Sequence, residues 1–209
     1  FATSRNEFYD HPTALPSVYS SSIKLDLLRR DFTMNTLAIQ LSPERSANRL
    51  LDFYGGFNDL QNKTIRVLHS LSFVDDPTRV LRAIRFEHRL GFTIEKRTAE
   101  LIDSAHPMLR RITGERLRNE LKSLLNENKP ERELLIMQKR GILPAIHPDL
   151  NFDALAVNNF KTARETQDHW PLQIGKIRHI YWHIIMSYLP PERLSDLCGR
   201  LLFGRNWIN

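Results

Sequence analysis

The sequence predicts an α+β protein that is mostly α. Short runs of β-branched and apolar residues, separated by turn residues, lie before residue 68, whereas apolar residues at helical spacing continue from about residue 77 onward. The chain has 209 residues, of which 41% are hydrophobic and 26% charged. Such a composition is typical of a globular protein with a buried core and excludes a disordered chain. No apolar run reaches the roughly 18–20 residues that a membrane span needs.

The first third of the chain reads as short elements joined by turns. Prolines and a run of serines indicate an extended or loop-like start, and Ser22 is a candidate helix cap. Gly55-Gly56 marks a turn. The expected elements are an extended segment at 1–20, a helix at 23–30, strands at 36–41, 48–52 and 64–68, and a short helix ending near Gln61.

The remainder is expected to be helical almost throughout. Asp75-Asp76-Pro77 places a carboxylate cap before a proline at the first helical position, and Gly91 is a candidate helix end. The expected helices cover 77–90, 95–105, 113–125, 131–140 and 177–188, with one or two more in the last third.

The positive charge is concentrated in one segment. The chain carries 30 Lys and Arg against 24 Asp and Glu, a net charge of +6. Residues 79–140 hold 15 of these cations and 9 of the anions, so the whole excess lies there. A surface that faces a polyanion has this pattern, and solvated helix faces with ion pairs explain it equally well.

Arginines recur along one side of the expected helix at 77–90. Arg79, Arg82, Arg85 and Arg89 fall within an arc of roughly 120°, at about 100° per residue. Asp76 stands at the N-terminal end of this row. A plain helix cap with a solvated face is the simplest interpretation of the five residues.

Hydrogen-bond complementarity gives a sharper interpretation of Asp76 and Arg79. A carboxylate accepts from an amino group, and a neighbouring guanidinium donates to a ring nitrogen. Cytosine and adenine present that pair of groups, whereas uracil and guanine present the reverse. The pair would therefore admit C and A and repel U and G, and the remaining arginines would hold phosphates.

A second cluster, Arg29-Arg30-Asp31, has Asn35 one helical turn beyond Asp31. Cations at a helix C-terminus are the simpler explanation. Asp52 to Gly56 would bring backbone close to a ligand or form a plain turn, and no phosphate loop of the Walker type is present.

Histidine and cysteine provide no catalytic or metal motif. His179 and His183 lack the glutamate of a zincin, and Cys198 stands alone. A single cysteine excludes an intramolecular disulfide and a multi-cysteine zinc site. These residues predict no metal site in this chain, and a reducing cytoplasm is the expected compartment.

At these clusters the sequence resembles the class II tRNA nucleotidyltransferase and bacterial poly(A) polymerase family. The match has two long, specific blocks, at Leu25–Asn35 (L-D-L-L-R-R-D-F-T-M-N) and Ser72–Phe86 (S-F-V-D-D-P-T-R-V-L-R-A-I-R-F). Two shorter blocks support it, at Leu50–Leu60 (L-L-D-F-Y-G-G-F-N-D-L) and Gly114–Leu121 (G-E-R-L-R-N-E-L). Together the blocks cover about residues 1–145.

The resemblance implies three parts. Residues 1–68 would be the remainder of a nucleotidyltransferase head, or palm; residues 69–128 a helical neck that recognises the base; and residues 129–209 the start of an RNA-binding helical body. The implied activity is addition of C and/or A from CTP and ATP to a tRNA 3′ end, without a nucleic-acid template. It implies that Asp76 and Arg79 read the base, that Arg30, Arg82 and Arg85 bind the triphosphate and sugar, and that Asp31 and Asn35 organise the pocket.

The resemblance also defines what this chain is not expected to do alone. The family places its Mg²⁺-binding carboxylates and phosphate loop before the R-R-D-F-T block, so we expect no catalytic residue in this chain and no nucleotide incorporation by the purified chain. A non-catalytic RNA-binding or regulatory module on the same scaffold, and a poly(A) polymerase, are the alternatives. The RNA-docking surface, the role of residues 146–209 and the oligomeric state stay open.

Overall fold

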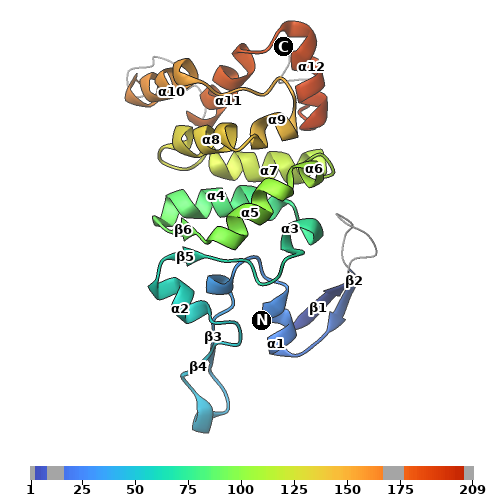
Figure 1. The fold of residues 1–209 in the computed structure, drawn as a ribbon, viewed down its shortest axis with the longest axis vertical. Helices are drawn as coiled ribbons and strands as arrows, with labels where there is room; N and C mark the ends of the chain where they lie inside the picture. Colours follow the sequence, from blue (N-terminus) through green and yellow to red (C-terminus); the bar gives the residue numbers. More distant parts are fainter. Residues whose placement is uncertain (1–2, 9–16, 167–176, 205–209) are drawn as a thin grey trace. The chain divides into compact units, whose positions relative to one another are not determined.

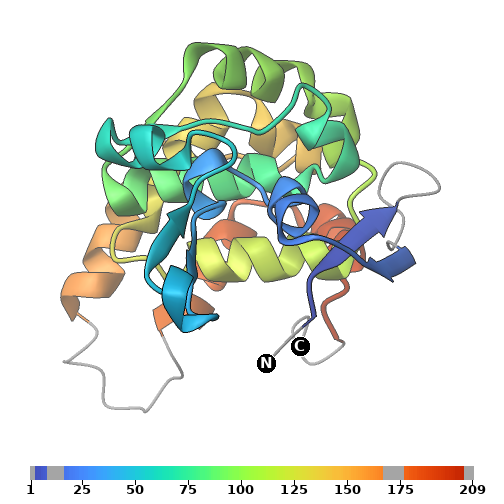
Figure 2. The same cartoon turned by 90° about the horizontal axis from the view of Figure 1, so that it is seen from below.

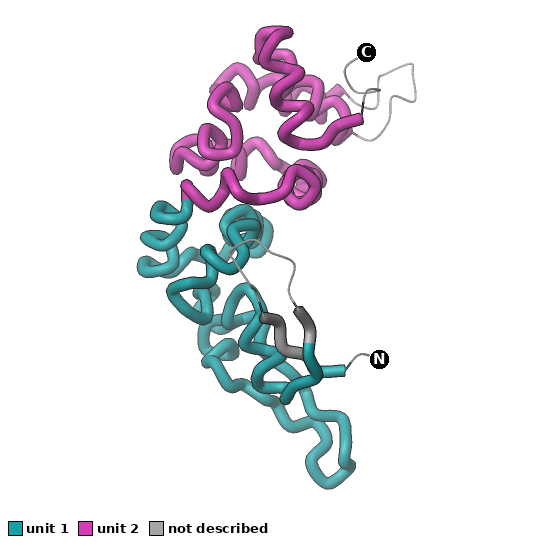
Figure 3. Tube along the Cα trace, turned by 90° about the vertical axis from the view of Figure 1, so that its right-hand side faces the viewer, with its two compact units in different colours: residues 1–105 teal, residues 106–209 magenta. Residues whose placement is uncertain are grey.

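The computed structural model describes residues 3–8, 17–166 and 177–204, and its contacts divide the chain into two compact units, residues 1–105 and 106–209 (Figure 3). Short strands precede a long run of helices, which confirms the predicted class (Figure 1). The division after residues 68 and 128 refers to functional parts and stays a prediction. Among the described helices, none combines the length and hydrophobicity needed to cross a bilayer.

The strands of the first unit form three small pairs. β1 (Arg5–Phe8) and β2 (Ser17–Ser20) are antiparallel, and β1 packs beside α1 (Figure 2). β3 (Ala38–Gln40) and β4 (Arg49–Leu51) lie within the two strands predicted at 36–41 and 48–52, and they pair antiparallel. β5 (Thr64–Ile65) runs parallel to β6 (Thr93–Ile94). Sequence missed β6 and the β1–β2 pair because two to four residues carry too little periodicity.

The helices of the first unit begin and end close to the predicted positions. Ser22 caps the first helix as expected, by accepting from the Leu25 N–H at 3.4 Å, and Gly91 ends the fourth. The short α3 and the 3₁₀ turns were not predicted. The helical elements are α1 (Ile23–Leu28), η1 (Thr33–Asn35), η2 (Glu44–Ser46), α2 (Gly56–Gln61), α3 (Ser72–Asp75), α4 (Thr78–Leu90) and α5 (Lys96–Ser104).

α4 buries its apolar face in the core of the first unit. Val80 and Ile84 are fully buried there, as is Phe32, the residue after Asp31. The Phe32 ring meets the Phe86 ring edge to face at 5.9 Å. Burial of apolar side chains is the main favourable term in folding, so this contact ties the segment around Asp31 to α4.

Two adjacent glycines serve different purposes at the start of α2. Gly55 has φ +73°, a left-handed conformation that costs other residues energy, and open space surrounds it. A Cβ on Gly56 would lie 2.2 Å from the Thr33 carbonyl oxygen. The backbone at Gly56 therefore lies close to the Thr33 backbone, and the approach to a ligand suggested by the sequence stays a prediction.

Asp52 and Asp59 fix this contact from either end of α2. Asp52 accepts from the N–H of Gly56 at 2.8 Å, and Asp59 accepts from the Thr33 hydroxyl at 2.6 Å. Arg66 donates to Asp59 at 3.0 Å. The D-x-x-G-G-x-x-D block thus holds the R-R-D-F-T block in place.

The second unit is a helical bundle. Its core contains Leu117, Met137 and Phe160, and the Phe160 ring stacks on the Tyr181 ring at 4.2 Å. α6 and α9 were not expected, and the described part of the unit also confirms the helices at 113–125, 131–140 and 177–188. Its helices are α6 (His106–Leu109), α7 (Gly114–Leu124), α8 (Pro130–Lys139), α9 (Ile142–Ile146), α10 (Ala154–Thr166), α11 (Ile177–Ser187) and α12 (Pro191–Arg200).

The G-E-R-L-R block joins the start of α7 to the end of α12. A Cβ on Gly114 would lie 2.3 Å from the Arg200 carbonyl oxygen. Arg118 donates to the Leu201 carbonyl at 3.1 Å, and Arg200 donates to the Ile112 carbonyl at 2.8 Å. The block closes the bundle by joining segments more than 80 residues apart in the chain.

We predict that Gly56→Ala destabilises the first unit by about 3 kcal/mol or more, because the new methyl group overlaps backbone that cannot move aside. The matched control is Gly55→Ala, which meets no atom and costs about 1–2 kcal/mol for its left-handed conformation. Urea unfolding measures both. Equal losses for the two variants would show that the approach to Thr33 is not tight.

We also predict that Glu133 makes stability depend on pH. This α8 side chain is fully buried, and burial raises its pKa from 4.5 to about 7, with Glu127 and Glu131 adding to the rise and Arg132 opposing it. A raised carboxyl pKa means that the folded state binds the proton more tightly. The free energy of unfolding should therefore fall by up to about 3 kcal/mol as the pH rises from about 4.5 to about 7.

Glu133→Gln should abolish that fall, whereas Glu165→Gln, an exposed change in the same unit, should keep it. Unfolding in urea at several pH values makes the comparison. A pH dependence that is the same in both variants would contradict the assignment to Glu133.

Candidate functional site

Asp31 is the centre of the polar cluster in the first unit. It follows α1 and is only 8% exposed. Its carboxylate accepts from the Phe32 N–H at 3.0 Å, from Asn35 Nδ2 at 2.7 Å and from Arg82 Nε at 2.9 Å. The three donors come from two parts of the chain, since Arg82 lies on α4, 51 residues away.

The charge of Asp31 is held by these partners. Burial by itself would raise the pKa of this carboxyl. Hydrogen bonds from Asn35, Arg82 and the Phe32 backbone, together with the charge of Arg82, outweigh it and leave the pKa below its ordinary value. Asp31 is therefore an ionised, buried acceptor that orients Arg82.

Arg79 makes a second link between α4 and the end of α1. Its guanidinium donates from Nη2 to the Arg29 carbonyl oxygen at 2.7 Å and from Nη1 to the Ser72 hydroxyl at 2.7 Å. The residue is 6% exposed. The solvated-face interpretation of the arginine row is therefore wrong at this position, because Arg79 is part of the buried structure.

Asp76 lies between α3 and α4 and caps α4. Its Oδ1 accepts from the Thr78 N–H at 3.0 Å and from the Thr78 hydroxyl at 2.6 Å. Asp76 thus satisfies the first N–H of α4 as expected, but α4 begins at Thr78 and its N-cap residue is Pro77, which the sequence had placed at the first helical position. Asp76 and Arg79 share the first turn of the α4 region, and hydrogen bonds within the protein hold both side chains.

Asp75 precedes this cap and lies near a histidine. Its Oδ2 is 3.8 Å from His69 Nε2. Burial lowers the pKa of His69, Asp75 raises it and Arg79 lowers it, with a net decrease. The neutral imidazole is therefore favoured at this position near pH 7.

Arg82 and Arg85 share one aromatic ring. Their guanidinium carbons lie 5.4 and 5.3 Å from the centre of the Phe86 ring, within the range of a cation–π contact. Both arginines are half-buried, whereas Arg89, the last member of the row, is exposed. Phe86 thus keeps two cations of α4 close together.

Arg29 and Arg30 meet Asp26 of α1. Arg29 Nη2 is 3.0 Å from Asp26 Oδ1, and Arg30 Nη2 is 3.6 Å from Asp26 Oδ2. Asp26 is 7% exposed, while Arg30 is exposed. The predicted favourable meeting of cations with a helix end is therefore supplemented by a buried carboxylate.

The structure brings most of the predicted site residues into one cluster. Asp31, Asn35 and Arg82 are in direct contact, Arg79 reaches the same segment through the Arg29 carbonyl, and Arg85 joins through Phe86. Arg30 lies beside this group with Asp26 as its partner. In the sequence analysis, the Arg29–Asn35 cluster and the arginine row of α4 were two separate clusters.

Three contributing residues were missed: Asp26, Ser72 and Phe86. Each lies inside one of the two specific blocks of the family resemblance. Membership of a block was therefore the signal in the sequence that could have identified these residues as part of the site. A buried serine such as Ser72 or a half-buried phenylalanine such as Phe86 gives no periodic pattern that distinguishes a site from a core.

Two family descriptions match this chain. Residues 1–66 match the poly(A) polymerase head domain, and residues 91–153 match the probable RNA- and SrmB-binding site of polymerase A. α4 lies between the two matched segments. A curated relative, the A-adding tRNA nucleotidyltransferase of Geobacter sulfurreducens, is 47% identical over 99% of this chain, which spans 24% of that protein.

Solved structures show the same fold. A CCA-adding enzyme in an apo form superposes with a TM-score of 0.89 at 37% identity, over all of this chain and 50% of that one. A CCA-adding enzyme with ATP has a TM-score of 0.81 at 37% identity, covering 90% and 46%, and a CTP complex is also similar. The Thermotoga maritima enzyme with tRNA has a TM-score of 0.79 at 33% identity, covering 99% and 54%. The chain therefore belongs to the family of tRNA nucleotidyltransferases and bacterial poly(A) polymerases.

Proposed function

We propose that this chain is the nucleotide-selecting part of an enzyme that adds A and/or C, from ATP and CTP, to a tRNA 3′ end without a nucleic-acid template. The chain spans about a quarter to a half of its relatives, so the activity belongs to a longer protein. Support comes from the A-adding relative and from similar enzymes solved with ATP, CTP and tRNA. A cytoplasmic location agrees with the single, buried cysteine.

The observation that best supports this proposal is the contact between residues 29–31 and α4. Arg82 binds Asp31 at 2.9 Å, and Arg79 binds the Arg29 carbonyl at 2.7 Å. These links support the proposal, because they join the first two turns of α4 to the Arg29–Asp31 segment. Guanidinium groups bind phosphate oxygens in a bidentate manner, so Arg30, Arg82 and Arg85 are the proposed triphosphate and sugar contacts.

Base selection by Asp76 and Arg79 sets a physical requirement. Two of the five N–H groups of Arg79 donate to Ser72 and Arg29, and one oxygen of Asp76 accepts from Thr78. A base edge must therefore share Arg79 and Asp76 with these partners, or replace one of them. Where the partners are shared, the anchored side chains need little reorganisation, which favours discrimination between bases.

Mg²⁺ is the metal expected in the whole enzyme, where it would assist phosphoryl transfer. Among the described residues, no group of three or more His, Cys, Asp or Glu side chains fits a metal ion. No step of the reaction is therefore assigned to a metal bound by this chain. The proposed roles here are binding, orientation and selection of the nucleotide.

We predict that Asp76→Asn relaxes base selection in the full-length protein. Asparagine keeps an oxygen that can accept from Thr78, so α4 stays capped, but its amide donates where a base amino group also donates. Preference for ATP and CTP over UTP and GTP should fall about 10-fold or more. Incorporation of each nucleotide into tRNA measures the preference.

Arg85→Ala serves as the control, because loss of a phosphate contact should weaken use of all four nucleotides alike. Unchanged nucleotide choice in Asp76→Asn would contradict base reading by this residue. A uniform loss in both variants would assign Asp76 to the helix cap alone.

A further inference from the structure

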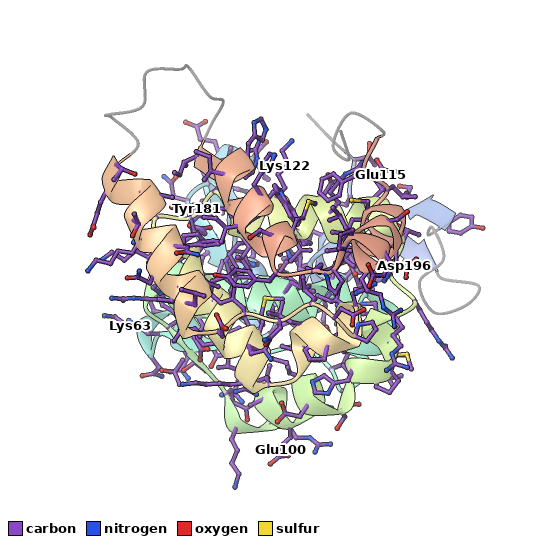
Figure 4. All side chains as sticks on the ribbon, turned by 90° about the horizontal axis from the view of Figure 1, so that it is seen from above. Lys63, Glu100, Glu115, Lys122, Tyr181 and Asp196 are labelled. Atoms are coloured by element: carbon purple, nitrogen blue, oxygen red, sulfur yellow. The ribbon has the colours of Figure 1, made fainter. Side chains whose placement is uncertain are left out.

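A polar pocket of about 270 Å³ lies in the second unit, away from the Asp31 cluster in sequence. α7, α11 and the residues after α12 line it, and we call it the α7–α11 pocket. Its principal side chains are Arg118, Asn119, Lys122, Arg178, Trp182 and Phe203. Figure 4 labels Lys122, from α7, and Tyr181, from α11. The matched RNA-binding description ends at residue 153, so five of the eight described lining residues of the pocket lie beyond it.

The charge of the α7–α11 pocket is positive. Arg118, Lys122 and Arg178 contribute three cations, and no carboxylate is present among its described lining residues. Two of these cations are held in position. Arg118 donates to the Leu201 carbonyl at 3.1 Å, and Arg178 donates to Asn126 Oδ1 at 2.8 Å. Fixed cations with no anion between them favour an anionic ligand.

Aromatic rings lie beside these cations. Trp182 is 3% exposed and meets the half-buried Phe203 edge to face at 5.0 Å. The Arg118 guanidinium carbon lies 6.0 Å from the centre of the Phe203 ring. Proteins that bind single-stranded nucleic acid combine cations along the backbone with aromatic side chains on which bases stack. The pocket has both features, the cations Arg118, Lys122 and Arg178 and the half-buried ring of Phe203.

We propose that the α7–α11 pocket binds one nucleotide unit of an RNA strand, with the phosphate on Lys122 and Arg178 and the base against Phe203. The inference rests on the proposed function only in that RNA is the substrate. It extends RNA recognition to α11 and to the end of α12. Arg118 of α7 holds Phe203 in this position, through its hydrogen bond to the Leu201 carbonyl and its contact with the Phe203 ring.

The test measures binding of a fluorescent oligoadenylate of about 12 nucleotides to the full chain, by anisotropy over a series of salt concentrations. Lys122→Ala should weaken binding and reduce the slope of log K against log salt by about 0.7, and Lys122→Ala with Arg178→Ala by about 1.4. Lys161→Ala is the matched control. Lys161 is an exposed cation on α10 in the same unit and should leave the slope within error of wild type.

Phe203→Ala separates stacking from charge. It should lower the affinity about 5- to 10-fold with no change of slope, because no phosphate contact is lost. Thermal unfolding of each variant provides the folding check. Lys122 is exposed, so its substitution reports on binding alone.

Two results would overturn the proposal. One is a double variant that binds the oligomer with the same affinity and slope as Lys161→Ala. The other is competition by free AMP that equals competition by the oligomer at the same nucleotide concentration, which would identify a free-nucleotide site. Neither result depends on base choice at Asp76, so failure of the pocket and failure of the proposed function are distinguishable.

Discussion

The ion pair between Asp31 and Arg82 is the interaction on which the candidate site depends. It joins the segment after α1 to α4 across 51 residues, and the side chain of Asp31 is 9% exposed against 33% for Arg82. Removing one partner of such a pair leaves a charge without compensation in a poorly solvated place. Asn35 and the Phe32 N–H satisfy the carboxylate further. Arg82 is therefore oriented before any ligand arrives.

The surrounding blocks support this pair in a defined order. Gly56 allows α2 to reach the Thr33 backbone, and Asp59 accepts a hydrogen bond from the Thr33 hydroxyl. These contacts from α2 fix the chain directly after Asp31. Arg79 and Ser72 fix α4 from the other side. Arg79 and Asp76, two of the predicted ligand contacts, thus make hydrogen bonds that hold the fold itself. Under the proposed function, such a site would select a nucleotide through rigidity, since few groups would need to be ordered on binding.

Local signals predicted the long elements and both clusters of the site. Three local features identify α4: the proline after Asp75-Asp76, the glycine at position 91 and the spacing of the apolar residues. Each depends only on neighbours within a few residues along the chain, so it can be recognised without knowledge of the fold. The contact between Asp31 and Arg82 was not predictable from spacing, because it depends on the path of the chain between them. The burial of Arg79 was missed for the same reason: a row of arginines reads as solvated until the Arg29 carbonyl is placed beside it.

The most direct test of this account is a double-mutant cycle on Asp31→Asn and Arg82→Met, followed by the free energy of unfolding in urea. We expect a coupling energy of about 1–3 kcal/mol, as found for residues in one buried network. The coupling should also fade below about pH 4, because the lowered pKa of Asp31 means that its stabilisation is lost as the carboxyl is protonated. Additive losses, with a coupling below about 0.3 kcal/mol, would show that the two segments do not depend on this pair.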